Sequence, residues 1–220
     1  PLLHKEFAEW CAARGKKFIV MYGQTEATAG ITTANIDDSI YERATTIGHP
    51  MNHLEIKIAE DKEILVRGYV VMSGYFRDPD GTKEAIDEDG YLHTGDLGFF
   101  NENGNIVLLG RKKDLIIRGG ENISPLEIET FLSYNNSIEK AKVIGVPDKH
   151  YGEEIALCVI LKRGSMLTED DIKNSIKGEL ADYKVPKYVV FMDNFPETSS
   201  GKVKTSELKE KVINILSIGG

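Results

Sequence analysis

The sequence predicts a mixed fold, α/β and α+β, in two parts. In the first part the hydrophobic pattern starts as helix, strand and loop, and then changes to short alternating stretches separated by glycines. After a charged run at residues 111–114, helix and strand patterns continue through the rest of the chain. We therefore expect an α/β piece plus a β-rich subdomain over residues 1–112, followed by a small α+β domain over residues 113–220.

The first part begins with helix and strand signals. Residues 4–14 place apolar side chains at helical spacing and predict a helix, and the apolar residues 18–21 predict a strand. Further on, alternating stretches such as 63–67 predict paired strands. Two expected turns, DPDG at 78–81 and NENG at 101–104, interrupt them, because Asp and Asn bond to nearby backbone and glycine accepts positive φ.

The second part carries a clear helix start. Ser124 precedes a proline and stands three residues before Glu127, an arrangement typical of a helix N-terminus. The patterns that follow predict strand, strand, helix and strand at residues 141–146, 155–161, 168–180 and 188–192. This order is typical of a compact α+β domain.

Composition excludes several classes of protein. The 220 residues are 41% hydrophobic and 28% charged, as in a soluble folded protein. The net charge of −8 disfavours nucleic acid as a partner, since phosphates require a basic surface. Cys11 and Cys158 are too few for a disulfide framework or a cysteine metal site, which favours a reducing, cytoplasmic location. The longest apolar stretch, 156–161, is much shorter than the ~20 residues that cross a bilayer, so we expect no transmembrane segment.

Two groups of polar side chains suggest nucleotide chemistry. Residues 22–26 (YGQTE) follow a strand, and Glu26 is able to bind Mg²⁺ while Thr25 donates to a phosphate oxygen. Asp96 lies beside a glycine turn, where a carboxylate can accept hydrogen bonds from a ribose diol. From composition alone, a polar capping loop and simple turn stabilisation are the commoner explanations.

A third group is PETSSGKV at 196–203, which places Lys202 on a small, polar loop. It is not a P-loop, because that motif requires an earlier glycine and a Ser or Thr where this chain has Val203. A mobile lysine can stabilise negative charge that develops on a carboxylate or phosphate. A solvated surface lysine is the default alternative.

Taken together and in order, four stretches resemble the adenylate-forming superfamily, which comprises acyl-CoA synthetases, luciferases and the adenylation domains of peptide synthetases. They are MYGQTEAT at 21–28, GYLHTGDLG at 90–98, GRKKDLIIRGGENISPLEIE at 110–129 and PETSSGKV at 196–203. The resemblance is nearest to acyl-CoA synthetases. It implies that residues 1–112 are the end of a large N-terminal AMP-binding domain and that residues 113–220 are a mobile C-terminal AMP-ligase domain.

The resemblance also implies a role for each matching residue of the first part. Tyr22, beside Gly23, would stack on adenine, Thr25 would bond to the α-phosphate, Glu26 would bind Mg²⁺, and Asp96 and Arg111 would hold the ribose hydroxyls.

In the second part, the resemblance implies a domain rotation. Lys202 would reach the substrate carboxylate and the α-phosphate during adenylation. Lys113 would be the hinge that then brings Gly119 and Gly120 to the pantetheine arm of coenzyme A. Thr205 departs from the family, which usually carries Arg there, so one supporting contact is in question.

The expected activity is that of an ATP-dependent acid–thiol ligase. A carboxylic acid, fatty or aromatic from the breadth of the family, and ATP would give acyl-adenylate and pyrophosphate, and coenzyme A would then displace AMP. Residues 1–20 do not replace the family's upstream phosphate loop and acyl pocket. We therefore expect a truncated enzyme that needs its N-terminal region for turnover.

Two other interpretations stay open. One is an adenylation enzyme that loads a carrier protein, which a carrier domain downstream in the gene would reveal. The other is a non-catalytic nucleotide-binding or interaction module in which Glu26, Asp96 and Lys202 are only elements of the fold. Loss of pyrophosphate release in a Lys202→Ala variant would separate a catalyst from such a module.

Overall fold

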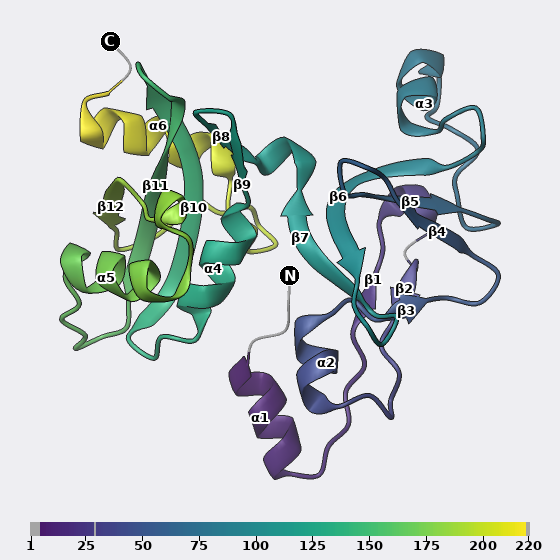
Figure 1. Cartoon of the computed structure of the whole chain (residues 1–220), viewed down its shortest axis with the longest axis horizontal. Helices are drawn as coiled ribbons and strands as arrows, with labels where there is room; N and C mark the ends of the chain where they lie inside the picture. The colour runs from purple at the N-terminus through teal and green to yellow at the C-terminus, as the bar shows by residue number, and fades with distance from the viewer. Residues whose placement is uncertain (1–4, 29, 219–220) are drawn as a thin grey trace. The chain divides into compact units, whose positions relative to one another are not determined.

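The computed structural model describes residues 5–28 and 30–218, and the chain forms two compact units, Pro1–Lys113 and Asp114–Gly220 (Figure 1). The division between them lies one residue from the predicted boundary. The predicted mixture of α/β and α+β structure is confirmed, with a β-rich first unit and a second unit in which helices cover a sheet.

Unit 1 combines helices with two antiparallel sheets, ordered β1-β2-β3 and β4-β5-β6-β7. Its helical elements are α1 (Lys5–Ala13), the 3₁₀ turn η1 (Thr25–Ala27), α2 (Ile40–Thr45), α3 (Pro79–Ala85) and the 3₁₀ turn η2 (Lys112–Asp114), which continues into unit 2. Its strands are β1 (Met21–Tyr22), β2 (Thr32–Thr33), β3 (His49–Pro50), β4 (Glu55–Ile58), β5 (Glu63–Arg67), β6 (Leu92–Phe100) and β7 (Ile106–Arg111).

One apolar cluster holds the two sheets of unit 1 together. It joins the buried side chains of Ala27, Ile31, Ile47, Ile64, Val66, Leu92 and Ile106. Because Ala27 lies in η1 and Leu92 in β6, this core fixes the loop after β1 against the four-stranded sheet.

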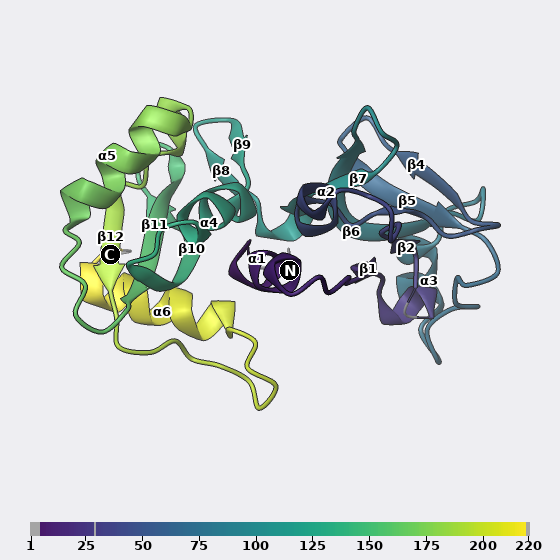
Figure 2. The ribbon, with the colours of Figure 1, turned by 90° about the horizontal axis from the view of Figure 1, so that it is seen from below.

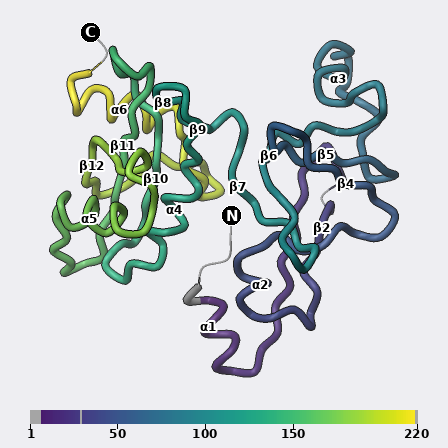
Figure 3. The backbone as a smooth tube through the Cα atoms, viewed as in Figure 1, coloured from purple at the N-terminus to yellow at the C-terminus, as the bar shows by residue number. Residues whose placement is uncertain are grey.

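Two local predictions in unit 1 are corrected. Of the expected strand at 18–21, only Met21 lies in β1, and the carbonyl oxygen of Phe18 accepts from the Arg43 side chain at 3.1 Å. The tube in Figure 3 traces this stretch as the link from α1 to β1. The helix predicted at 4–14 is observed as α1, with His4 outside the described residues.

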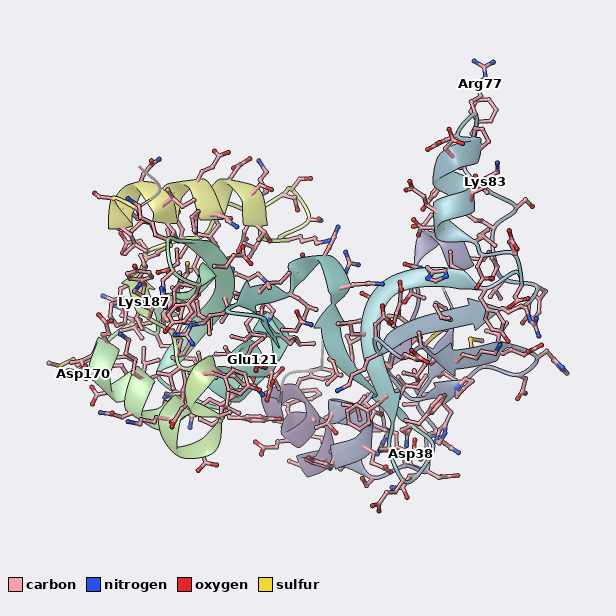
Figure 4. All side chains as sticks on the ribbon, turned by 45° about the horizontal axis from the view of Figure 1, so that its top comes forward. Asp38, Arg77, Lys83, Glu121, Asp170 and Lys187 are labelled. Carbon is pink, nitrogen blue, oxygen red and sulfur yellow. The ribbon has the colours of Figure 1, made fainter. Side chains whose placement is uncertain are left out.

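The DPDG sequence forms a helix start instead of a turn. Asp78 is the N-cap of α3, and its side chain accepts from the backbone N–H of Gly81 at 2.9 Å. Arg77, just before this cap, projects from the outer end of α3 (Figure 4). The NENG sequence is a turn as predicted, with the Asn101 side chain accepting from two backbone N–H groups and Gly104 at φ +77°.

Unit 2 is a sheet of order β10-β11-β8-β9, with β12 parallel to β11. The predicted strands and the two predicted helices are confirmed, and β8, β9 and α6 are additions to them. The elements are β8 (Ile116–Arg118), β9 (Glu121–Ile123), α4 (Pro125–Ser133), β10 (Ile138–Asp148), β11 (Gly152–Leu161), α5 (Glu169–Glu179), the 3₁₀ turn η3 (Asp182–Lys184), β12 (Tyr188–Phe191) and α6 (Thr205–Leu216).

The alternation of side chains along β11 gives this sheet two apolar faces. Ile155, Leu157 and Val159 face the helices α4 and α5, and Ala156, Cys158 and Ile160 face α6. Figure 2 shows α5 and α6 on opposite sides of the sheet. Thr168 caps α5 through a capping box with Asp171, which explains why that helix begins where the sequence predicts it.

Both cysteines are free and buried, as expected of a chain without a disulfide framework. Within residues 5–28 and 30–218, no helix combines the length and the apolar character that crossing a membrane requires.

Candidate active site

The loop after β1 presents the first group of predicted site residues. Thr25 and Glu26 lie in η1, whose third residue, Ala27, is fully buried and anchors the turn. The carbonyl oxygen of Glu26 accepts from the backbone N–H of Met72 at 2.8 Å, and the Tyr75 hydroxyl donates to its carboxylate Oε1 at 3.1 Å. The Glu26 side chain is therefore held by a contact that the sequence did not reveal.

Asp96 is the centre of the second group. It lies in β6 directly opposite Arg111 in β7, and Arg111 Nε donates to Asp96 Oδ1 at 3.1 Å. The Tyr22 hydroxyl donates to the other carboxylate oxygen at 2.7 Å. Only 8% of the Asp96 side chain is exposed, against 45% of Arg111. Residues that the sequence places 74 positions apart thus form one bonded group.

The Tyr22 phenol stays neutral in this setting. Burial of its hydroxyl is the main cause that raises the pKa of Tyr22, and the negative charge of Asp96 raises it further. A neutral phenol is a hydrogen-bond donor, so it can hold the Asp96 carboxylate in a fixed orientation. Each carboxylate oxygen keeps a second lone pair, so Asp96 can still accept from a bound diol.

Sequence analysis missed Glu63, a buried carboxylate beside this group. Its Oε1 accepts from the backbone N–H of Gly95 at 2.9 Å, and its Oε2 lies 3.2 Å from His93 Nδ1 and 3.0 Å from Lys112 Nζ. Burial alone would raise the pKa of Glu63, but bonds from His93, Lys112 and Gly95 outweigh it and lower the pKa. Glu63 therefore fixes the turn that precedes Asp96.

An open pocket of about 650 Å³ lies in unit 1 beside these groups. Residues 23–26, Thr94, Gly95 and residues 111–113 line it. It thus brings together four of the predicted positions in unit 1 (Gly23, Thr25, Glu26 and Arg111) and the predicted hinge, Lys113. Tyr22 and Asp96 do not line the pocket. They are connected to it by Arg111, which lines the pocket and donates to Asp96.

The pocket suits a phosphate-bearing ligand. Lys112 is already paired with Asp61 at 2.6 Å and with Glu63, whereas Lys113 forms no ion pair with another described residue. Arg111 uses Nε for Asp96 and presents its exposed guanidinium group at the pocket. The volume falls within the range of small-molecule sites, and guanidinium and ammonium groups are the usual partners of phosphate.

One carboxylate at this pocket, that of Glu26, is available to a divalent cation. The described residues contain no cluster of three His, Cys, Asp or Glu side chains able to hold a metal by themselves. Mg²⁺ is commonly held by one or two carboxylates together with waters and substrate phosphates. Glu26, at the pocket and bonded through one oxygen only to a neutral phenol, fits that mode of binding.

Lys202, the predicted catalytic lysine, belongs to unit 2. It follows a tight turn, in which Thr198 N–H donates to the Lys202 carbonyl at 2.8 Å and Thr198 Oγ1 accepts from Lys202 N–H at 3.1 Å. Gly201 closes the turn at φ +78°. The loop projects from the body of unit 2 (Figure 2). The Lys202 side chain is exposed, and no carboxylate among the described residues pairs with it.

Gly119 and Gly120 are also in unit 2, at the tip of the β8–β9 hairpin. Both have positive φ, +58° and +92°, as a two-residue type I′ turn requires. A Cβ at Gly120 would meet nothing within 4 Å, so the tip presents bare backbone to solvent.

Comparisons with known proteins agree with this geometry. The family model for AMP-binding enzymes matches residues 2–76, and the model for the C-terminal domain of AMP-binding enzymes matches residues 127–202. Among relatives, YngI of Bacillus subtilis (strain 168) is 42% identical over 214 residues, and human ACSF2, a mitochondrial medium-chain acyl-CoA ligase, is 39% identical over 215 residues. The match covers 92% of this chain in both cases, but only 39% of YngI and 35% of ACSF2.

The fold is similar to that of solved enzymes. ATP-bound MatB from Rhodopseudomonas palustris superposes with a TM-score of 0.88 at 32% identity, over 98% of this chain and 44% of MatB. The o-succinylbenzoate CoA synthetase MenE from Bacillus subtilis, in complex with AMP, gives 0.82 at 32% identity, over 95% of this chain and 44% of MenE. The two family models and the likeness of nearly the whole chain to these enzymes point the same way. The chain therefore belongs to the adenylate-forming superfamily of AMP-binding enzymes.

Proposed function

We propose that the protein that contains this chain is an acyl-CoA synthetase, an ATP-dependent acid–thiol ligase. The observation that carries the proposal is the bonded group of Tyr22, Asp96 and Arg111 beside the pocket that Thr25 and Glu26 line. The similarity to ACSF2, named as an acyl-CoA ligase, and to MatB with bound ATP supports it. In this proposal residues 1–112 are part of the AMP-binding domain and residues 113–220 are the AMP-ligase domain.

In the proposed site, the residues of unit 1 bind the nucleotide. Asp96 and Arg111 hold the ribose hydroxyls, and the ring of Tyr22, held by Asp96, stacks on adenine next to Gly23. Thr25, which lines the pocket, donates its hydroxyl hydrogen to the α-phosphate. Glu26 is the protein ligand of Mg²⁺, which neutralises charge on the phosphates when it is bound.

Adenylation needs a cation that meets the charge formed as the carboxylate oxygen attacks the α-phosphorus and pyrophosphate leaves. We assign this role to Lys202. Its exposed ammonium group has no carboxylate partner among the described residues and is therefore available to a ligand. Electrostatic stabilisation of this kind is commonly the largest single contribution to catalysis.

Thioester formation follows in the same protein. The sulfur of coenzyme A attacks the acyl carbonyl carbon, and AMP leaves with the electron pair of the broken bond. We place the pantetheine arm at Gly119 and Gly120, because bare backbone allows a narrow chain to approach closely. Lys113 is the proposed hinge, and it lies at the junction of the two compact units.

The substrate and the location remain predictions. A fatty acid is the substrate class that the name of ACSF2, a medium-chain ligase, supports. A cytoplasmic location is consistent with two free cysteines, although ACSF2 is named as mitochondrial.

The test measures pyrophosphate release and acyl-CoA formation by the complete protein, with ATP and a panel of carboxylic acids. Lys202→Ala should lower pyrophosphate release by roughly 100-fold or more, the usual cost of removing one group that stabilises developing charge. Lys204→Ala is the matched control, because Lys204 is also exposed but is paired with Glu207 at 2.7 Å. It should keep nearly full activity.

Each failure points to a different alternative. Pyrophosphate release without any CoA thioester would favour a carrier protein as acceptor. The absence of pyrophosphate release with every acid would favour a nucleotide-binding module without catalysis. Equal losses in Lys202→Ala and Lys204→Ala would assign the effect to the loop and not to the Lys202 ammonium group.

A further inference from the structure

We infer that Glu154 and Tyr151 are positioning residues for thioester formation, because together with Arg118 they hold the glycine hairpin of residues 116–123 in place. This inference rests on the proposed function and deepens it. None of these three residues belongs to the site predicted from the sequence.

The base of the hairpin is anchored by Ile116 and Ile123, which are buried in the core of unit 2, but its tip has little to hold it. Its strands β8 and β9 have three residues each, and they are joined by two consecutive glycines with positive φ. Among the described residues, its strands pair with the main sheet at one antiparallel position, where Arg118 lies opposite Gly152 in β11. An isolated two-stranded hairpin is marginally stable in water. Its orientation therefore depends on side-chain contacts.

One of these contacts is an ion pair, which is close in distance but lacks hydrogen-bond geometry at Arg118 Nε. Arg118 Nε lies 2.8 Å from Glu154 Oε1, with 2% of the Glu154 side chain and 25% of the Arg118 side chain exposed. The second oxygen of Glu154 accepts from the backbone N–H of Ile155 at 3.2 Å, so the carboxylate is fixed to β11. A buried carboxylate requires a counter-charge. Arg118, the last residue before the glycines, supplies it.

Tyr151 also contacts Arg118 and the first glycine of the hairpin. Its ring lies under the Arg118 guanidinium group, with 4.6 Å from Cζ to the ring centroid. Its carbonyl oxygen accepts from the backbone N–H of Gly119 at 3.0 Å. A Cβ at Gly119 would stand 3.0 Å from Tyr151 Cδ1, which is tighter than ordinary contact. The first glycine is thus required by Tyr151, whereas Gly120 is free of neighbours.

A further bond comes from Glu153, which lies between Gly152 and Glu154 in the chain. Its Oε2 accepts from the backbone N–H of Ile117 at 3.1 Å, and its Oε1 is 3.2 Å from Lys209 in α6. Consecutive residues at the start of β11 therefore bind consecutive residues of β8. This arrangement fixes the hairpin at its tip.

The consequence is a separation of the two half-reactions. In the proposed function, adenylation uses the residues of unit 1 and Lys202, whereas Glu154 pairs with Arg118 beside the glycines. Thioester formation, in the proposed function, uses the backbone of Gly119 and Gly120. Loosening the hairpin should therefore slow the second half-reaction and spare the first, since a misplacement of about 1 Å can cost 100-fold in rate.

The experiment uses the complete protein with an acid that it adenylates. ATP–pyrophosphate exchange without coenzyme A reports adenylation, and single-turnover reaction of the preformed acyl-adenylate with coenzyme A reports thioester formation. Glu154→Gln should keep exchange within twofold of wild type and slow thioester formation by roughly 10- to 100-fold. Arg118→Gln should be slower still, because it leaves the Glu154 carboxylate buried without a counter-charge.

Two controls separate positioning from general damage to the fold. Glu129→Gln removes a similar pair in unit 2, with Lys142 at 2.9 Å and 18% of the Glu129 side chain exposed, and should leave both half-reactions within twofold. Tyr151→Phe keeps the ring and the backbone carbonyl and should behave like wild type, whereas Tyr151→Ala should resemble Glu154→Gln. In the 220-residue chain, Glu154→Gln should also speed amide exchange at Gly119.

The outcomes discriminate clearly. Unchanged thioester formation in Glu154→Gln, or an equal loss in both half-reactions, overturns the inference. A wild-type protein that exchanges pyrophosphate but never forms a thioester overturns the proposed acceptor, and the inference with it. Faster Gly119 exchange together with a selective loss of thioester formation supports it.

Discussion

The surroundings of Asp96 and of Lys202 are opposite in character. Asp96 is buried, both of its oxygens are bonded, and its neighbours come from three strands, β1, β6 and β7. Lys202 is exposed, and its backbone is positioned by hydrogen bonds to Thr198 within a short turn. Buried, bonded groups are preorganised for a ligand, while an exposed lysine on a loop can change position at little cost. The contrast suits the proposed site, in which fixed residues of unit 1 bind the nucleotide and a mobile Lys202 reaches the α-phosphate.

The largest expected effect tests the rigid half of this comparison. Asp96→Ala should lower the free energy of unfolding of unit 1 by about 1–3 kcal/mol, because it removes the partner of Tyr22 and Arg111. Urea unfolding followed by tryptophan fluorescence measures it, since Trp10, in unit 1, is the single tryptophan. Asp37→Ala, with 81% of its side chain exposed, is the control and should change little. Equal stability of the two variants would contradict the buried network.

A Glu63→Gln variant tests the buried network through the pH dependence of the free energy of unfolding. At pH 7 it should lower the free energy of unfolding by about 1.5 kcal/mol, because a charged acceptor is lost. The folded-state pKa of Glu63 is lowered, so its contribution is complete above the unfolded pKa of about 4.3 and disappears as pH falls through the folded pKa. The gap between wild type and variant should therefore close below about pH 4. A gap that is constant down to pH 2 would exclude the ionised carboxylate as its cause.

Gly201→Ala tests what shapes the loop of Lys202. An alanine would have room there, since nothing lies within 4 Å, but φ +78° would strain it by about 1 kcal/mol. Thermal unfolding of unit 2 followed by circular dichroism should show this loss. Gly164→Ala, also at positive φ with open space, is a comparison of the same kind outside the loop. A Gly201→Ala variant that is more stable than wild type would show that residue 201 does not keep its positive φ in solution.

The smallest effect belongs to Lys202 itself. Lys202→Ala should change the free energy of unfolding by less than about 0.5 kcal/mol, as surface substitutions do. Circular dichroism in urea provides the measurement. A loss above 1 kcal/mol would mean that Lys202 holds the fold, which would remove the contrast with Asp96.

Sequence patterns predicted the long strands β10 and β11 and the helix α5 of unit 2, because their apolar patterns extend over ten or eleven residues. Thr168 and its capping box mark the start of α5 in the sequence as clearly as in the structure. In unit 1 the pattern at 18–21 overestimated a strand, since the carbonyl oxygen of Phe18 accepts from the side chain of Arg43, 25 residues away. DPDG also begins a helix as readily as it forms a turn. Local signals are reliable where local bonds decide the structure.

Individual site residues were predicted from the sequence, but most contacts between them were not. Asp96 and Arg111 were found through motifs, and their pairing follows from the β6–β7 register. Glu63 carried no signal, because a glutamate in an alternating strand is normally exposed. It turns inward at an irregularity in the pairing of β5 with β6, which no single-sequence pattern reveals. The same holds for Glu154, since its partner Arg118 lies 36 residues earlier.

The burial of both cysteines gives the chain a low background for chemical labelling. Cys158 is fully buried, and that burial raises its pKa to about 12, so almost no thiolate forms at neutral pH. Cys11 is also buried. A single cysteine introduced at the exposed position 202 would then be the preferred target of a maleimide dye. Distance measurements from such a dye would then report the position of the loop of residues 196–203 in solution. No native thiol would need to be removed first.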